Sequence, residues 1–296
     1  MTVTSTLRKN TKKLTLNNGQ KIPVVGFGTW KATGEGEAYK AVKTALQKGY
    51  RHIDAAEHYH NEEEVGKGIK DSGVPREEIF VTTKLWNVDH KKVREALDLS
   101  LKRLGLDYID LYLIHWPVAT DPATNEPYKD WDYVDTYKEL QRVMKTTGQI
   151  RSIGVSNMSI KQLEKLLSDE EVTVKPVVNQ IEAHPLLTQP ELYDYMASKD
   201  IKIEAYSPLG SVNSPLFKNE TIVDIANKYG VEPANVLISW AVQRGTIVLP
   251  KSTTEHRIIS NLNTFRLHRD DFDTLNNLSS KYGVKRTNDP AWYNFE

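Results

Sequence analysis

The sequence predicts an α/β fold, a single (β/α)8 barrel of the TIM type, and three observations support this prediction. Short apolar runs typical of buried strands alternate with amphipathic helical patterns along nearly the whole chain. Eight such runs occur, which is the number of strands that closes such a barrel. The chain has 296 residues and no Pro- or Gly-rich linker, so it fits one barrel better than two doubly wound domains.

The predicted strands are rich in Val, Ile and Leu, as expected for parallel strands that are buried on both faces. They are Val24–Gly28, Arg51–Ala55, Ile79–Thr83, Ile109–His115, Ile150–Val155, Val177–Ile181, Ile201–Tyr206 and Ile247–Leu249.

Helical patterns lie between these strands, and several are followed by a glycine that can cap the helix. The patterns cover Glu37–Gln47, Glu62–Asp71, Lys91–Leu104, Tyr133–Lys145, Ile160–Leu167 and Glu191–Ser198, with capping glycines at 49, 73, 105 and 148. Two further patterns, Thr221–Tyr229 and Ala234–Arg244, precede the eighth strand. One extra helix is therefore expected there.

The N-terminal region predicts a hairpin in front of the barrel. Leu14–Leu16 and Lys21–Pro23 flank an Asn-Gly turn at residues 17–20, which is typical of a tight hairpin. We expect this hairpin to cover the barrel floor. The predicted organisation is then a flexible, solvated arm over residues 1–13 and one barrel domain with a C-terminal tail over residues 14–296.

Composition excludes several classes of protein. Lys plus Arg and Asp plus Glu each number 39, so the net charge is zero and a nucleic-acid partner is not expected. The chain has no cysteine, which excludes disulfides, thiolate metal sites and cysteine nucleophiles. The longest run without a charged residue, Ala205–Phe217, is too short for a membrane span. The polar N-terminal residues lack the apolar stretch of a secretory signal, so we expect a cytoplasmic protein, with a mitochondrial address as the alternative.

Three short motifs suggest other functions. Residues 26–31 begin like a dinucleotide fingerprint, but Lys31 stands where the third glycine is required. Residues 154–158 lack the final glycine of a serine hydrolase elbow. His58 and His60, with Asp54 before them and His184 after a later strand, could instead be ligands of a metal-dependent barrel hydrolase. This alternative stays open at this stage.

Four polar residues lie where predicted strands end, which is where barrel enzymes hold their active sites. Asp54 and Lys84 end the second and third strands, Tyr59 follows in the loop after the second, and His115 ends the fourth. An ammonium beside a tyrosine lowers the pKa of the hydroxyl from about 10, so Lys84 would activate Tyr59 as a proton donor. Asp54 would hold Lys84, and a neutral His115 would bond a carbonyl oxygen. A reduced nicotinamide is the best source of the hydride that this chemistry needs.

The motifs that contain these residues closely resemble those of the aldo-keto reductases, and the resemblance covers almost the entire chain. They are DAAEHYHNE at 54–62, TKLW at 83–86, DYIDLYLIHWP at 107–117, GVSN at 154–157, NQIE at 179–182 and PKS at 250–252. The similarity is greatest to the fungal glycerol dehydrogenases and aldehyde and ketoester reductases. It implies a single barrel, Asp54, Tyr59, Lys84 and His115 as the catalytic tetrad, and NADPH-dependent reduction of aldehydes, ketones and ketoesters by a monomer, with NADH as a weaker cofactor.

The resemblance also implies how the cofactor is bound. Tyr206 would stack on the nicotinamide, and Ser156, Asn157 and Gln180 would hold its carboxamide. Gly28, Thr29 and Asp54 would lie along the ribose, and Ser207, Leu209 and Ser211 would contact the pyrophosphate. The adenosine end would meet Lys251, Ser252, Arg257 and Asn261, where two cations suit a 2′-phosphate, although Ser260 replaces the usual Glu or Gln before that Asn.

Aromatic residues after the strands predict the substrate pocket. Trp30, Trp86 and Trp116 follow strands one, three and four, so they would form an apolar rim above Tyr59 and His115. In the resembling family, the loop at residues 116–131 and the tail with Trp292 and Tyr293 vary with specificity.

Overall fold

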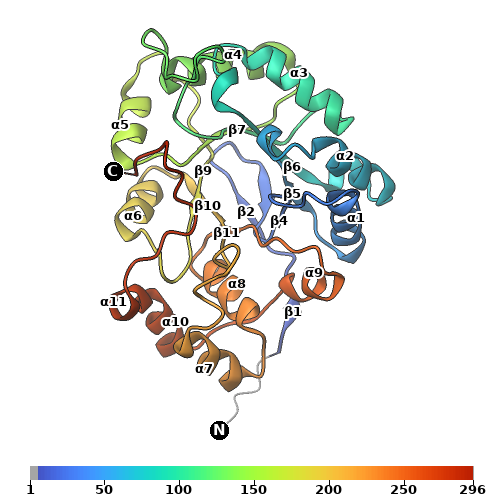
Figure 1. Ribbon diagram of the computed structural model, residues 1–296, viewed down its shortest axis with the longest axis vertical. Helices are drawn as coiled ribbons and strands as arrows, with labels where there is room; N and C mark the ends of the chain where they lie inside the picture. The colour runs from blue at the N-terminus through green and yellow to red at the C-terminus, as the bar shows by residue number, and fades with distance from the viewer. Residues whose placement is uncertain (1–5, 296) are drawn as a thin grey trace.

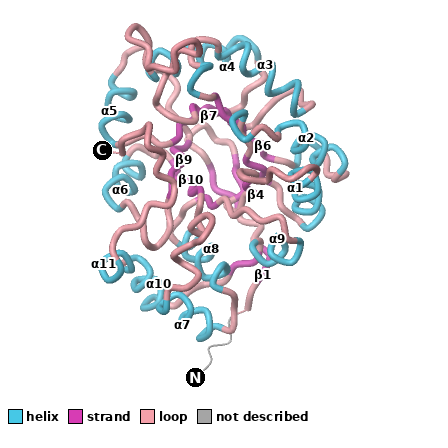
Figure 2. Tube along the Cα trace, in the orientation of Figure 1, coloured by secondary structure: helices cyan, strands magenta, loops and turns pink. Residues whose placement is uncertain are grey.

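The computed structural model describes residues 6–295 and confirms the predicted (β/α)8 barrel. Eight parallel strands follow one another around the barrel in chain order, β4 to β11, and a bridge between Val25 and Val248 closes the ring. Helices surround the strands on the outside (Figures 1 and 2). The strands are β4 (Phe27–Gly28), β5 (His52–Asp54), β6 (Phe80–Leu85), β7 (Leu111–Ile114), β8 (Ile153–Ser156), β9 (Val178–Glu182), β10 (Lys202–Tyr206) and β11 (Ile247–Val248).

The helices follow the predicted positions to within a few residues. They are α1 (Glu37–Lys48), α2 (Glu62–Asp71), α3 (Val93–Leu104), α4 (Tyr133–Thr147), α5 (Ile160–Ser168), α6 (Pro190–Ser198), α7 (Glu220–Tyr229), α8 (Pro233–Gln243), α9 (Glu255–Asn261), α10 (Arg269–Asn276) and α11 (Leu278–Tyr282), with short 3-10 turns η1 (Glu57–Tyr59), η2 (Arg76–Glu78) and η3 (Asn87–Asp89). Helix α7 is the extra helix expected before the last strand. Helix α9 follows the last strand, and α10 and α11 lead into the tail; these three helices have no counterpart among the predicted helical patterns.

The predicted hairpin is present, and it closes the floor of the barrel. Strand β2 (Lys13–Thr15) pairs with β3 (Lys21–Pro23), and Gly19 in the turn has a φ of 86°. Asn17 donates to the carbonyls of Pro176 and Asp200, just before β9 and β10. The hairpin therefore lies against the amino ends of the strands, opposite the end where active sites form.

The N-terminal arm is more ordered than predicted. Strand β1 (Arg8–Lys9) pairs antiparallel with β12 (Asn263–Thr264), and the side-chain amide of Asn10 donates to Thr264 at 3.0 Å. Arg8 and Lys9 are exposed to solvent, as expected for the arm, but their backbone pairs with the segment after α9. Residues 1–5 lie outside the described part of the chain.

In residues 6–295, no helix combines the length and the apolar character that a membrane span requires.

Candidate active site

A cavity of about 780 Å³ opens at the carboxyl ends of the strands. This volume suits a ligand of cofactor size, and the position is that of active sites in this fold. The cavity gathers the residues predicted for catalysis, cofactor and substrate, except Lys84 and Ser156, which do not line it. Its lining includes Gly28, Thr29, Trp30, Asp54, Tyr59, Trp86, His115, Trp116, Asn157, Gln180, Tyr206, Ser207, Leu209, Ser211, Lys251, Ser252, Arg257 and Asn261.

The predicted tetrad is assembled around the Lys84 ammonium, which is fully buried. Lys84 Nζ donates to Asp54 Oδ2 at 2.7 Å, to the carbonyl of Ala55 at 2.8 Å and to the Tyr59 hydroxyl at 3.1 Å. Strands β5 and β6 pair in parallel, and η1 after β5 turns Tyr59 back over them. Two neighbouring strand ends therefore supply the whole contact.

The charges of this cluster follow from burial and pairing. Burial by itself would lower the pKa of Lys84, but Asp54 and Tyr59 outweigh it and raise that pKa, so the ammonium stays charged. Burial raises the pKa of Tyr59 above its ordinary value, and Lys84 only partly opposes this. The prediction that Lys84 lowers the pKa of Tyr59 below its ordinary value is therefore wrong for the chain without cofactor. The cost of burying a charged phenolate is larger than its attraction to the Lys84 ammonium. Tyr59 holds its proton at neutral pH.

His115 follows β7 and faces Tyr59 across the cavity floor. Its ring centroid lies 5.8 Å from that of Tyr59 and 5.2 Å from that of Trp86. The side chain of Asn157 donates to the His115 carbonyl at 3.0 Å and fixes this segment. Burial and, to a lesser degree, Lys84 hold the pKa of His115 well below its ordinary value. The imidazole is therefore neutral.

A hydrogen-bonded chain joins the residues predicted to hold a carboxamide. Gln180 donates to Asp54 Oδ1 at 2.9 Å, and Tyr206 donates to Asn157 Oδ1 at 2.7 Å. Ser156 is buried beneath them, and its hydroxyl donates to the Gln180 carbonyl at 2.8 Å. The structure thus places Asn157, Gln180 and Tyr206 on the cavity wall, whereas Ser156 supports that wall and does not line it.

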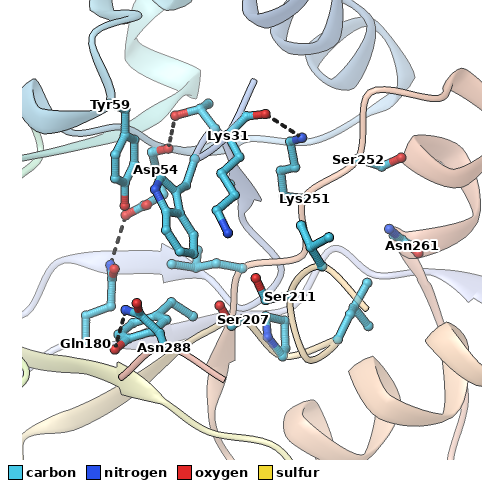
Figure 3. Close-up of a pocket in the computed structure, with 18 of the residues that line it drawn as sticks. Lys31, Asp54, Tyr59, Gln180, Ser207, Ser211, Lys251, Ser252, Asn261 and Asn288 are labelled. Carbon is cyan, nitrogen blue, oxygen red and sulfur yellow. Dashed lines mark hydrogen bonds between the residues drawn. The ribbon is translucent and has the colours of Figure 1, made fainter. Parts of the chain in front are cut away.

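The opposite end of the cavity is basic. Lys251, Ser252 and Asn261 line it (Figure 3), and so does Arg257. Lys251 Nζ donates to the Lys31 carbonyl at 3.1 Å, and neither cation makes a salt bridge among the residues described. Burial and, less strongly, the Lys31 ammonium lower the pKa of Lys251. A bound anion would stabilise the charged form of Lys251, so these cations and polar side chains fit a phosphorylated nucleotide.

Gly28 lines the cavity and packs closely on the segment after β11. A Cβ atom at this position would lie 3.2 Å from the carbonyl oxygen of Leu249 and 3.5 Å from the Lys251 side chain. The absence of a side chain therefore lets β4 approach the segment that carries Lys251. Thr29 beside it donates from its hydroxyl to the Asp54 carbonyl at 2.8 Å.

Tryptophans form the other wall of the cavity, as predicted. His58 stacks on Trp86 with 3.5 Å between ring centroids. Trp292 of the C-terminal tail joins this wall, with its ring centroid 4.9 Å from that of Trp116 and 6.0 Å from that of Trp86. An apolar wall therefore stands over the polar floor.

Lys31 and Asn288 are among the cavity residues that escape sequence reasoning. Lys31 has a φ of 61°, and its side chain points between the two ends of the cavity (Figure 3). It directly follows Trp30, so the strand-end rule could have included it. Asn288 lies in the tail and donates to the Tyr206 hydroxyl at 3.3 Å. No local pattern marks it.

The histidines of the hydrolase alternative are not gathered into one site. His58 stacks on Trp86, whereas His184 is buried and bonds through Nε2 to Glu182 Oε1 at 2.9 Å. Within the described range, no group of three or more His, Asp or Glu side chains has the arrangement of a metal site. The alternative that used His58, His60 and His184 is therefore wrong.

Comparisons with known proteins agree with this geometry. Residues 24–280 match the Aldo/keto reductase family. The chain is 50% identical to glycerol 2-dehydrogenase (NADP(+)) of Saccharomyces cerevisiae, over 99% of this chain and 98% of that protein, and 49% identical to aldehyde reductase YPR1 of the same yeast, over 98% of each. A crystal structure of a Bombyx mori aldo-keto reductase in complex with NADP superposes with a TM-score of 0.87 at 39% identity, over 95% of both chains. The chain belongs to the aldo/keto reductase family.

Proposed function

We propose that this aldo-keto reductase uses NADPH to reduce aldehydes and ketones, including aromatic and aliphatic aldehydes and ketoesters, to alcohols, with Tyr59 as the proton donor. The observation that carries the proposal is the Tyr59 hydroxyl, which lies 3.1 Å from Lys84 Nζ and faces His115 in the cavity. A protonated tyrosine beside a buried cation and a neutral imidazole is suited to giving a proton to a carbonyl oxygen.

The cofactor supplies the hydride when it is bound. Tyr206, Asn157 and Gln180 would hold its nicotinamide end, with Ser156 supporting them. Ser207, Leu209 and Ser211 would meet the pyrophosphate, and Lys251, Ser252, Arg257 and Asn261 the adenosine end. The two cations at that end favour the additional phosphate of NADPH, so we expect NADH to bind more weakly.

Each tetrad residue has a separate task in the proposal. His115 donates a hydrogen bond to the carbonyl oxygen and sets its direction, because a neutral imidazole keeps one N–H group. The Tyr59 O–H then transfers its proton to that oxygen as negative charge develops there. Lys84 stabilises the phenolate that forms, and Asp54 keeps Lys84 charged and in place.

The relatives support this substrate class. Two yeast proteins of about 50% identity are named as a glycerol dehydrogenase and an aldehyde reductase, and a 45% identical Escherichia coli relative is named methylglyoxal reductase DkgA. Trp30, Trp86 and Trp116 would favour the larger apolar carbonyls among such substrates.

Absorbance at 340 nm tests the proposal by following consumption of the reduced cofactor. The purified chain is assayed with benzaldehyde, an aliphatic aldehyde and a ketoester, and with NADPH and NADH in parallel. We expect carbonyl-dependent oxidation of NADPH that persists after treatment with EDTA and is slower with NADH. Turnover that requires added zinc, or no carbonyl-dependent oxidation by the folded chain, would contradict the proposal.

We also propose a cytoplasmic location, because a chain without cysteine needs no oxidising compartment. The family resemblance further leads us to propose a monomer. Light scattering after size-exclusion chromatography measures the oligomeric state, and a fluorescent fusion gives the location.

A further inference from the structure

Glu182, the last residue of β9, is a buried carboxylate that accepts four hydrogen bonds. His184 Nε2 donates to its Oε1 at 2.9 Å. The backbone N–H and the hydroxyl of Thr287 donate to the same oxygen at 2.7 and 2.6 Å, and the N–H of Asn288 donates to Oε2 at 2.9 Å. Three of the four donors therefore belong to the C-terminal tail, 105 residues or more along the chain.

These bonds explain how a carboxylate is tolerated in this position. Burial by itself would raise the pKa of Glu182, but the hydrogen bonds from His184, Thr287 and Asn288 outweigh it and lower the pKa. The side chain is therefore charged at neutral pH. Hydrogen bonds to a charged acceptor are stronger than neutral ones, so this contact is a firm attachment for the tail. Glu182 itself does not line the cavity and has no part in the proposed proton transfer.

The tail that starts at this attachment continues along one side of the cavity, where Asn288, Pro290 and Trp292 line it. It runs from α11 past β10 and β9 toward α5 and α6 (Figure 1). Asn288, whose N–H binds Glu182, donates from its side chain to the Tyr206 hydroxyl, and farther along the tail Trp292 packs edge-on against Trp116. The far end is held by Tyr293, whose hydroxyl donates to the Asn157 carbonyl at 3.0 Å.

Trp292 itself is poorly held. Half of its surface, 51%, is exposed, and its ring contacts are all edge contacts. Its place at the cavity therefore depends on the attachments of the tail before and after it. A substrate with a large apolar body would be covered by this ring, whereas a short carbonyl compound at Tyr59 and His115 would not need it.

We propose that Glu182 is a positioning residue that docks the C-terminal tail and thereby sets the preference for bulky apolar substrates. This inference rests on the proposed carbonyl reduction, because selectivity is defined by that reaction. It assigns to the NQIE segment a second task beside that of Gln180. One strand would thus present a cofactor residue to the cavity and, two positions later, fasten the tail that covers it.

The first test measures tail docking without using activity. Lys285 and Arg286 are trypsin sites immediately before Thr287. In Glu182→Gln an amide N–H₂ replaces one acceptor oxygen and meets tail donors, so we expect cleavage after these residues to be about tenfold faster by mass spectrometry. Thr287→Val removes only the hydroxyl contact and should accelerate cleavage less, about threefold. Glu63→Gln, the same substitution at an exposed position of α2, is the control and should match the native chain.

The second test measures selectivity with the same variants. For Glu182→Gln we expect the KM for benzaldehyde to rise about tenfold, while catalytic efficiency with a three-carbon aldehyde changes less than about threefold. Trp292→Ala should shift the ratio of catalytic efficiencies for the large and the small aldehyde in the same direction. The double variant should shift this ratio no further than either single variant, because both substitutions remove the same contact between the Trp292 ring and the substrate.

The outcomes separate this inference from the proposed function. Unchanged tryptic cleavage in both Glu182→Gln and Thr287→Val would overturn tail docking by Glu182, whatever the activity. Faster cleavage with equal losses for large and small substrates would overturn the role in selectivity. Faster cleavage in a chain that consumes no NADPH with any carbonyl would instead support the docking and contradict the proposed reaction.

Discussion

At the floor of the barrel, hairpin β2–β3 inserts apolar side chains between the strands, whereas at the mouth the buried polar side chains of Asp54, Lys84 and His115 surround the half-buried Tyr59. The floor cluster consists of Leu16, Ile22, Phe80, Leu111, Leu113, Val177, Val178 and Ile247. It contains no group that needs a hydrogen bond, so it stabilises the fold by apolar burial alone.

The mouth is built on the opposite principle. Lys84 and Asp54 lie as deep as the floor residues, but each would destabilise the fold if its partner were removed. A buried ion pair contributes little stability compared with apolar packing. The Asp54–Lys84 pair instead positions the Tyr59 hydroxyl, to which Lys84 donates a hydrogen bond. The comparison teaches that this barrel keeps its apolar cluster at the floor and its chemistry at the mouth, although buried His52 and Glu204 also lie 3.3 Å apart beside Phe80 of the floor. The predictions below test that separation.

Tyr59→Phe should have the largest effect, and it should be confined to the mouth. The ring remains, but the proton donor is lost, so we expect kcat to fall by about 10² to 10⁴. The free energy of unfolding should change by less than about 1 kcal/mol. Stopped-flow assays and urea denaturation measure both quantities. A variant that kept more than about a tenth of the native kcat would show that Tyr59 is not the general acid.

Ile22→Ala should have the reverse effect at the floor. Ile22 is fully buried in the hairpin, and its truncation leaves a cavity, so we expect a loss of about 2 to 5 kcal/mol in the free energy of unfolding. Catalytic efficiency at 25 °C should stay within about twofold of the native value, because the folded mouth is unchanged. A large loss of kcat with little loss of stability would contradict the separation.

His90 sharpens the comparison, because it lies at the mouth end of the barrel but faces away from the cavity. Its Nδ1 atom contacts the Thr136 hydroxyl at 2.9 Å, and burial lowers its pKa to about 3. The unfolded chain takes up a proton here below about pH 6.5, and the folded chain does not, so stability falls as the pH drops from 6.5 toward 3. At pH 5 the loss is about 2 kcal/mol.

The test compares urea unfolding of the native chain and His90→Gln at pH 7 and pH 5. The variant should lose about 2 kcal/mol less between these values, since it lacks the titrating group, while other buried groups such as His115 titrate equally in both. An identical pH dependence in the two chains would show that His90 does not contribute this term.

Arg257→Ala should affect the cofactor but neither stability nor the chemical step. Loss of one charge-assisted contact to the 2′-phosphate should raise the KM for NADPH about tenfold and leave the KM for NADH nearly unchanged. Arg257 is exposed at the end of the cavity, so unfolding should be unaffected. An equal increase in the KM for NADPH and for NADH would show that Arg257 contacts a part of the cofactor other than the 2′-phosphate.

Trp30→Ala should have the smallest effect, a loss of selectivity at the rim. Trp30 is half-buried and lines the cavity. Removing about 40 Å² of apolar contact at about 25 cal/mol per Å² should reduce catalytic efficiency with benzaldehyde about fivefold relative to glyceraldehyde. If both substrates lost efficiency equally, the rim would not select by apolar area.

Much of the fold and most of the site could be predicted from local patterns. Eight apolar runs gave the eight barrel strands, and Gly49, Gly105 and Gly148 mark helix ends through their left-handed backbone. The tetrad was predictable because parallel strands bring their carboxyl ends to one edge of the barrel. Asp54, Lys84 and His115 each lie at or next to the end of such a strand, so topology brings them together.

Other features depended on residues far apart in the sequence. The pairing of β1 with β12, the inward support by Ser156 and the three bonds from the tail to Glu182 join segments without any shared periodicity. The direction of the Tyr59 pKa also required the fold, because the sequence reveals the Lys84 charge but not the depth of burial that opposes it.

The sequence by itself thus determined the barrel, its order of elements and the residues that meet at its mouth, because strand and helix periods and strand ends are local properties. Only the tertiary structure decided how the C-terminal tail lies over the cavity and what Glu182 binds. Those contacts form between backbone groups of Thr287 and Asn288 and a distant carboxylate, and backbone donors are the same in every sequence.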